Sequence, residues 1–370
     1  MTMQQRLDAV IDAAIEGKKT IVGTVVLVAH EGDIAYARSA GYADREARVP
    51  VRENTIFRLA SVTKPMVAAT ALALVERQQL SLDDEVATYL PWFTPKSPDG
   101  VVRPIRIRHL LSHTSGLGYD YAADPSITTG MQSTEFDYEQ NFSRVAKLPL
   151  SFAPGTAWQY STAIDVLGAV IAKLTGSSLE AAVARYVTTP LGMTDTAFHV
   201  TDRDRLAVPY GNAGPKPVRM DDPHTYTDAA GNRTVFSPGR IFNPRAFQSG
   251  GAGAVGTAPD FLKFLEALRR GGGPILKAET VAMAFSNQIG DLPRRPGDTG
   301  QRFGFIGAIV ADPKAAGSPV APGTIRWGGV YGHDWFIDRH NGFSVASFSN
   351  TAPEGCDGAY PHDIRDAVYG

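Results

Sequence analysis

The stretch that decides the fold is FRLASVTKPM, residues 57–66, which runs on into AATALALV, residues 68–75. The second segment carries no charge on any face, and a helix that is apolar all round is buried inside a protein. Ser61 and Lys64 stand three positions apart where this helix begins. Neither side chain belongs in a core without a partner. We therefore expect both to face a cleft.

The spacing of this pair is typical of an activated serine. Pro65 lacks an N–H and is tolerated in a first helical turn, so the helix is predicted to begin near Ser61. Residues three apart share one face there, so the Lys64 amine can bond the Ser61 oxygen. The helix N-terminus favours negative charge, and a lysine in a dry site can serve as a base for a serine nucleophile. The alternative is a capping serine beside an exposed lysine.

Length and composition indicate a globular protein of two structural units. The chain has 370 residues, 43% hydrophobic and 20% charged, more than one compact core usually carries. Lys and Arg number 36 against 38 Asp and Glu, a formal net charge of -2. Because no cluster of basic residues stands out, nothing favours nucleic acid or an anionic membrane as a partner.

The ends of the chain and its one cysteine bear on the compartment. Residues 1–19 form an amphipathic helical pattern with acids at Asp8, Asp12 and Glu16, unlike a signal peptide. The longest uncharged apolar run is far shorter than the roughly 20 residues of a spanning helix. Cys356 is the only cysteine, so no intrachain disulfide is possible. It lies in an acidic turn, so its thiol is expected to be inert. We expect a cytoplasmic protein, and no pattern indicates an oligomeric state.

Strand patterns gather at both ends of the chain and helical patterns in the middle. Predicted strands are 20–30 with 34–41 as a hairpin, 55–59, 303–311, 324–331, 335–338 and 343–350. Predicted helices are 106–112, 162–174 with a capping-box-like start at Thr162, 180–187, 259–270 and 361–369. Two long connections, 119–141 and 210–256, are rich in aromatic, Gly and Pro residues, and loops of that length tend to build binding sites.

This organisation predicts an α+β fold. Strands need partners, so the N-terminal and C-terminal strands are expected to form one antiparallel β-sheet flanked by helices. The sheet unit would comprise 1–64 and 278–370, and 65–277 would form a mainly helical lobe with long loops. A ligand site is expected in the cleft between the two units.

Three competing motifs were weighed. The esterase pattern Gly-x-Ser-x-Gly is absent from the sequence. His109 and His113 stand four apart, but no third ligand follows at a recognisable spacing, so backbone partners are favoured over a metal. Residues 251–256 match Gly-x-Gly-x-x-Gly without a preceding apolar strand, which favours a loop over a dinucleotide site. We expect no metal and no cofactor.

Further motifs stand in a fixed order after the Ser-x-x-Lys stretch. They are HLLSHTSGLGY at 109–119, SFAPGTAWQYS at 151–161, SGGAGAVGTAPDF at 249–261 and WGGVYGHDWF at 327–336. Together these motifs resemble the serine β-lactamase and penicillin-binding protein superfamily, and within it the family VIII carboxylesterases. The resemblance covers nearly the whole chain. It implies a β-lactamase/penicillin-binding-protein-like fold, in agreement with the periodicity.

The resemblance also implies catalytic roles. Ser61 would be the nucleophile, and Lys64 with Tyr160 would form the proton-transfer pair. The backbone N–H groups of Ser61 and Val330 would form the oxyanion hole. A phenol beside an ammonium has its phenolate favoured, and which of the pair is the main base is left open.

Two departures from class C β-lactamases point to the substrate. Tyr160-Ser161-Thr162 stands where those enzymes carry Tyr-x-Asn, and Trp327-Gly328-Gly329 stands where they carry Lys-Thr-Gly. An indole in place of a cation leaves a substrate carboxylate without its partner. The site is therefore expected to prefer neutral esters to anionic lactams. Substrate-binding candidates are Trp327, Gly328, Gly329, Tyr119, Trp158, His333 and Trp335, with Tyr121 and Phe136 from the long loops.

The sequence thus predicts a serine hydrolase that cleaves carboxylic esters of short acyl chains, with a small-molecule ester as its partner. Weak β-lactam hydrolysis is compatible with this prediction. The alternatives are a β-lactamase, a D-aminopeptidase or an acyltransferase with the same nucleophile, or a non-catalytic penicillin-binding or sensor protein. A binding-only protein has no need of Ser61, Lys64 and Tyr160 together, which argues against the last alternative.

Overall fold

One antiparallel sheet of eight strands organises the molecule, in the order β10-β11-β12-β13-β14-β1-β2-β3. The computed structural model describes residues 1–120, 126–212, 216–227, 231 and 233–370. In sheet order the strands are Gln301–Phe303, Ala308–Val310, Thr324–Gly329, His333–Asp338, Phe343–Ser349, Gly23–His30, Asp33–Asp44 and Val49–Pro50.

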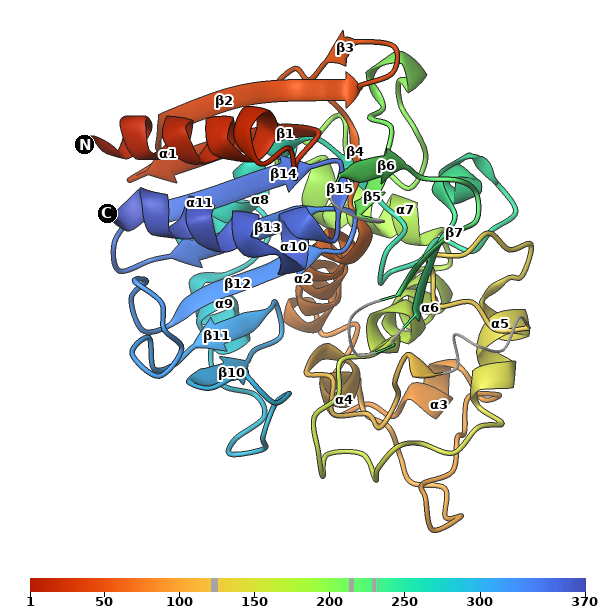
Figure 1. The fold of residues 1–370 in the computed structure, drawn as a ribbon. Coiled ribbons are helices and arrows are strands. Elements are labelled where there is room, and N and C mark those ends of the chain that lie inside the picture. The colour runs from red at the N-terminus through yellow and green to blue at the C-terminus, as the bar shows by residue number, and fades with distance from the viewer. Residues whose placement is uncertain (121–125, 213–215, 228–230, 232) are drawn as a thin grey trace.

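The two ends of the chain meet in the centre of this sheet. Strand β1 pairs antiparallel with β14, with Val26 opposite Ser347. The termini lie side by side (Figure 1). The Arg6 Nε donates to the Ala367 carbonyl at 2.9 Å. The predicted single sheet built from N-terminal and C-terminal strands is therefore confirmed.

Strand β1 is buried on both faces, and alternate residues serve two separate cores. Val26 and Val28 pack with helices on one face of the sheet, and Val25 and Leu27 pack on the other. This alternation follows from the two-residue period of a strand. Figure 1 shows α1 (Met3–Asp12) and α11 (Ala359–Tyr369) on the first face, and α2 (Thr63–Glu76), α8 (Ala258–Arg269) and α9 (Ala278–Ala284) on the second.

Helix α2 lies between the sheet and the second group of helices (Figure 1). Every residue from Thr63 to Leu74 is buried, which confirms that this apolar helix is internal. The second group comprises α3 (Val86–Tyr89), α4 (Ile107–Leu111), α5 (Tyr138–Val145), α6 (Ala163–Thr175) and α7 (Leu179–Val183), which continues as a π-helical turn at Ala184–Thr188. A central helix packed on all sides holds its first turn rigidly.

The structure corrects two local predictions. The predicted strand 303–311 is two strands, β10 and β11, joined by a turn in which Gly304 N–H donates to the Gly307 carbonyl at 2.9 Å. The predicted capping role of Thr162 is wrong, because the Ser161 hydroxyl instead accepts from Ala163 N at 3.3 Å.

The long connection 210–256 also contains strands that the sequence did not predict. They are β5 (Tyr210–Asn212), β6 (Pro217–Arg219), β7 (His224–Thr227), β8 (Arg233–Phe236) and β9 (Val255–Gly256), with β5 pairing β15 (Thr351–Ala352). Short, half-exposed polar strands of this kind carry little hydrophobic periodicity, so the pattern could not indicate them.

The division into two units stays a prediction. Helix α8 was grouped with the helical lobe, yet its Phe261 packs on the sheet against Trp335 and Phe348. Among the described residues no single helix is long and apolar enough to span a membrane. The bent pair Ala163–Thr175 and Leu179–Thr188 meets that test only jointly, by length and composition.

We expect Phe261→Ala to destabilise the protein by about 3–5 kcal/mol, the usual cost of emptying a buried aromatic site. Phe261 is 1% exposed, and its ring lies 5.8 Å from that of Trp335 and 5.6 Å from that of Phe348. Urea unfolding measures the loss. The matched control is Phe242→Ala, because Phe242 is 39% exposed, and it should lose less than about 1 kcal/mol. Equal losses in the two variants would contradict the assigned packing.

Candidate active site

The serine stands on a tight turn between a strand and the central helix. Strand β4 (Phe57–Arg58) pairs with β9, and Leu59 N–H donates to the Ala254 carbonyl at 2.9 Å. Ala60 then adopts a φ of 46°, in the left-handed region that residues with a Cβ seldom occupy. A 3₁₀ turn, Ala60–Val62, leads into α2. This sharp turn leaves Ser61 partly exposed while both of its neighbours are buried.

The amine of Lys64 bonds both the serine and the backbone of a distant loop. Its Nζ lies 3.1 Å from Ser61 Oγ and donates to the Gly251 carbonyl at 2.8 Å. The residue is only 5% exposed, and Nζ lies 4.7 Å from the centre of the Tyr160 ring. Lys64 is therefore buried, contrary to the alternative of a capping serine beside an exposed lysine.

Tyr160 and Trp327 complete this group of side chains. The Trp327 Nε1–H donates to the Tyr160 hydroxyl oxygen at 3.1 Å, and the two ring centres are 4.9 Å apart. Tyr119 lies on another side of Tyr160, with ring centres 5.6 Å apart. The structure thus brings together Ser61, Lys64, Tyr160, Trp327 and Tyr119, which come from four separate segments of the chain and which the sequence had singled out.

The end of β12 lies directly against the serine turn. A Cβ at Gly329 would come within 2.3 Å of the Leu59 carbonyl oxygen and 3.0 Å of a Val62 methyl group. Only a glycine lets this strand approach so closely. Val330, the next residue, is partly exposed and packs in one small cluster with Ala60. This placement suits the expected oxyanion hole, which stays a prediction.

His333 and Trp335 are not at the site, contrary to the expectation for substrate-binding residues. Both are 0% exposed on the central strand β13. His333 Nε2 bonds the Arg58 carbonyl at 2.7 Å, with Phe348 as its ring neighbour. Trp335 faces α8 in the core, 5.8 Å from Phe261. Both side chains lie on the same face of the sheet as Trp327, which is opposite Trp335 in the register, but Arg58 and Phe57 cover His333 and helix α8 covers Trp335.

The other loop aromatics lie in different places. Trp158 is 7% exposed and packs behind Tyr160, 6.4 Å from His113 and 5.4 Å from Phe303 between ring centres. Phe136 lies under the Arg144 guanidinium at 4.0 Å. Tyr121 falls outside the described residues.

The sequence patterns did not indicate the carboxylate that holds the loop to which Lys64 donates. Asp165 on α6 is fully buried and accepts from the Ser249 hydroxyl and from Gly251 N–H, the latter at 3.1 Å. Burial raises the pKa of Asp165, and the charge of Lys64 opposes that rise. A Cβ at Gly251 would lie 2.2 Å from Asp165 Oδ2. The Gly-rich loop is therefore no dinucleotide site; it presents the Gly251 carbonyl to Lys64.

The two histidines of HLLSH have different roles. His109 Nδ1 accepts from Arg106 N–H at 3.1 Å, which confirms the expected backbone partner. His113 instead bonds the Ser161 hydroxyl at 3.1 Å and lies 4.8 Å from the Tyr160 ring. Burial and the nearby Lys64 charge hold the pKa of His113 well below 6.5. Among the described residues no cluster of His, Cys, Asp or Glu could hold a metal ion.

Cys356 is also accounted for. Burial, and then the Asp357 carboxylate, raise the pKa of its thiol well above 9.0, so the thiolate that could act as a nucleophile is disfavoured. Its sulfur packs near Gly328, where a Cβ would lie 2.9 Å away.

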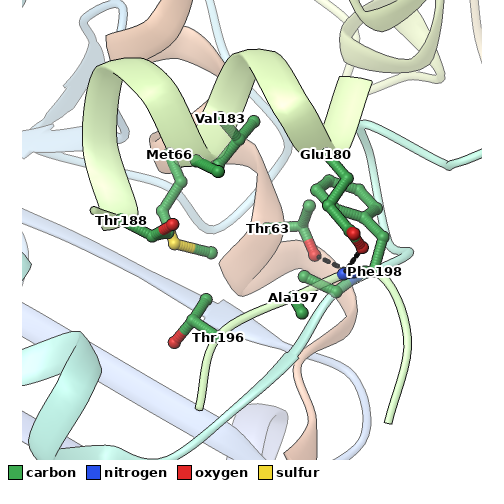
Figure 2. Close-up of a pocket in the computed structure, with 10 residues that line it drawn as sticks. Thr63, Met66, Glu180, Val183, Thr188, Thr196, Ala197 and Phe198 are labelled. Carbon is green, nitrogen blue, oxygen red and sulfur yellow. Dashed lines mark hydrogen bonds between the residues drawn. The ribbon is translucent and has the colours of Figure 1, made fainter. Parts of the chain in front are cut away.

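Small cavities flank α2 on opposite sides. One of about 10 Å³ lies behind Lys64, Tyr160 and Trp327. The other, of about 20 Å³, is drawn in Figure 2 and is lined by Thr63 and Met66 of α2. There Glu180 accepts from Phe198 N–H at 2.7 Å. Each cavity has room for about one water, so an ester must reach Ser61 from the partly exposed side.

These features define a serine-hydrolase site in which a Ser-x-x-Lys pair meets a tyrosine. The family described as Beta-lactamase matches residues 7–369. The chain belongs to this family.

Two relatives and one solved structure give the likeness in more detail. The chain is 46% identical over 377 residues to Esterase EstB of Burkholderia gladioli, covering 100% of this chain and 95% of the relative. It is 28% identical over 370 residues to Lovastatin esterase of Penicillium rubens, covering 90% of each chain. The structure of EstCE1, described as a hydrolase with promiscuous acyltransferase activity, matches with a TM-score of 0.93 at 42% identity, covering 99% of this chain and 98% of that one. The resemblance seen in the sequence and the expected fold class are confirmed.

We expect the protein to lose stability on acidification partly through His333. Burial lowers the pKa of His333 from 6.5 to about 4. Between these values the unfolded chain binds more protons than the folded one, so stability falls as pH falls through that window, by up to about 3 kcal/mol from this group.

Urea unfolding at pH 7 and at pH 4.5 measures this effect. His333→Gln keeps a donor for the Arg58 carbonyl but cannot titrate, so the loss between the two pH values should shrink by about 2 kcal/mol. The exposed His340→Gln serves as the control and should leave the loss as it is in the wild type. An unchanged loss in His333→Gln would refute this assignment.

Proposed function

We propose that this carboxylesterase cleaves short-chain acyl esters through an acyl-enzyme formed on Ser61. The observation that carries the proposal is the contact of 3.1 Å between Lys64 Nζ and Ser61 Oγ, made by a buried lysine whose Nζ also lies 4.7 Å from the Tyr160 ring. A serine is a weak nucleophile until an adjacent base takes its proton. This arrangement supplies two candidate bases.

The reaction follows from these positions. Ser61 Oγ attacks the ester carbonyl carbon, and its proton passes to the Lys64–Tyr160 pair. The carbonyl oxygen becomes an oxyanion held by the N–H groups of Ser61 and Val330, each worth roughly 3–4 kcal/mol in comparable sites. Collapse breaks the bond to the alcohol oxygen, which takes the proton back. Water then attacks the acyl-enzyme, and the same pair transfers protons in reverse to release the acid.

Two features support a neutral, short ester as the substrate. Trp327 donates its N–H to Tyr160 and offers no formal charge to a substrate carboxylate, unlike the lysine of a class C β-lactamase. The cavity behind Lys64, Tyr160 and Trp327 has room for about one water, so it offers no enclosed space for a long acyl chain. A cytoplasmic location and a small-molecule ester substrate, with neither nucleic acid nor a membrane as a partner, remain predictions.

Acyl transfer is the second candidate function. An acyl-enzyme on Ser61 reacts with an alcohol in the same way as with water, and the solved EstCE1 structure is described with promiscuous acyltransferase activity. Product analysis with a short-chain vinyl ester and added alcohol separates the two outcomes. Hydrolysis yields the acid, and transfer yields a new ester.

We expect Ser61→Ala to lose ester hydrolysis by at least about 1,000-fold, because no other group replaces the nucleophile. A phosphonate probe should add its mass to the wild type and not to Ser61→Ala, as read by mass spectrometry of the intact protein. Ser177→Ala, at an exposed serine, is the control and should label like the wild type. Full activity in Ser61→Ala would overturn the mechanism.

We also expect kcat/KM for p-nitrophenyl butyrate to exceed that for nitrocefin by at least about 100-fold, roughly the effect of an unpaired buried carboxylate. Both substrates release chromophores, so initial rates on one enzyme sample give the ratio. A ratio below one would make the protein a β-lactamase instead.

A further inference from the structure

A buried arginine lies behind the tryptophan that bonds Tyr160. The Arg294 guanidinium carbon lies 4.8 Å from the centre of the Trp158 ring, 5.5 Å from that of Phe303 and 5.8 Å from that of Trp327. The arginine side chain is only 2% exposed. A cation is thus enclosed by three aromatic rings, one of which bonds a candidate base.

The hydrogen-bonding groups of this arginine are only partly satisfied. Arg294 pairs with Asp298 at 3.1 Å and donates to Gln301 at 3.0 Å, but its buried Nε has no partner among the described residues. Burial lowers its pKa to about 10, so the group is still a cation at neutral pH. A buried cation with an unmade hydrogen bond is expensive, and the ion pair with Asp298 and the three ring contacts offset part of that cost.

The charge of Arg294 can act on Tyr160 through the Trp327 ring. A cation beside an aromatic ring is attracted to its π electrons and draws them toward itself. The indole N–H of Trp327 then becomes a stronger donor, and hydrogen bonds in a low-dielectric site polarise one another. That N–H donates to the Tyr160 oxygen at 3.1 Å. The field of Arg294 also reaches this side of the site, because it helps to hold down the pKa of His113.

We propose that Arg294 is a positioning residue that holds and polarises the Trp327 indole, so that its N–H stabilises negative charge on the Tyr160 oxygen while the Ser61 proton moves. The inference rests on the proposed function. Class C β-lactamases carry a lysine in Lys-Thr-Gly, where this chain has Trp327-Gly328-Gly329. In this chain Arg294, which lies behind Trp327, would supply the positive charge instead.

Other ionisable groups also lie near Tyr160 and Trp327, and the test must distinguish their effects from that of Arg294. Lys64 on α2 also faces Tyr160 directly, at 4.7 Å from its ring. His113 lies 4.8 Å from that ring, but it is neutral at pH 7 because burial holds its pKa well below 6.5. Asp298 partly offsets the charge of Arg294. Arg295 lies 5.9 Å from the Trp327 ring but has a side chain 59% exposed, so solvent screens its charge. Arg295 is therefore the matched control: a similar distance to the same ring, without burial.

The test compares Arg294→Met, Arg294→Lys and Arg295→Met in the pH dependence of p-nitrophenyl butyrate hydrolysis. In Arg294→Met we expect the acid limb of kcat/KM to move to higher pH by about half a unit or more. We expect kcat at pH 7 to fall about tenfold with KM changed less than about twofold. Arg294→Lys, which keeps the charge, should recover part of both effects. Arg295→Met should match the wild type.

A double-mutant cycle shows whether the effect passes through the indole. In a Trp327→Phe background, Arg294→Met should change kcat by less than about twofold, since the route to Tyr160 is already gone. Urea unfolding of each variant separates this effect from misfolding, because kcat is compared only among variants that are fully folded under the assay conditions.

The inference is wrong if Arg294→Met keeps the wild-type profile, or if its loss of kcat tracks lost stability. In either case the proposed function stands as long as Ser61→Ala fails to take up the phosphonate. If Ser61→Ala remains active, the proposed function itself is wrong, whatever the arginine variants do.

Discussion

The hydrogen bonds of one buried amine hold the site together. Lys64 Nζ lies 3.1 Å from Ser61 Oγ and 2.8 Å from the Gly251 carbonyl, so it ties the first turn of α2 to a loop 187 residues further along the chain. A lysine that is 5% exposed needs such partners to stay in the interior. The loop in turn is fixed by Asp165, which accepts from Gly251 N–H. The position of the amine therefore depends on three segments that are far apart in the sequence: the first turns of α2 and α6, and the loop that contains Gly251.

Close backbone approach is the second condition for the site. At Gly251 a side chain would meet Asp165, so this glycine lets its loop lie against α6, and at Gly329 it would meet the Leu59 carbonyl, so that glycine lets β12 lie against the serine turn. Ala60 at a φ of 46° adds strain at the same place. These features lower the local stability of the site, and the packing of the buried helix α2 beneath it offsets this loss.

Buried charges around the site show the same compromise. Asp165 is fully buried with one oxygen lacking a partner among the described residues, and Arg294 has an unbonded Nε. Each lies one contact away from a candidate catalytic side chain, Asp165 through Gly251 and Arg294 through Trp327. Their incomplete hydrogen bonding carries a cost in folding free energy, and their remaining partners tie the site to the surrounding elements.

Local pattern alone determined the buried helix behind Ser61 and Lys64, the hairpin and strands at the two ends, and the meeting of those strands in one sheet, because hydrophobic period and turn residues are written in short windows. The motifs, through the family resemblance that they carry, also indicate Tyr160 and Trp327. Only the tertiary structure decided that His333 and Trp335 face the core, and that Asp165, His113 and Arg294 surround the site. The reason is physical: which face of a strand is buried, and which distant segments meet, depend on packing between elements that no local window contains.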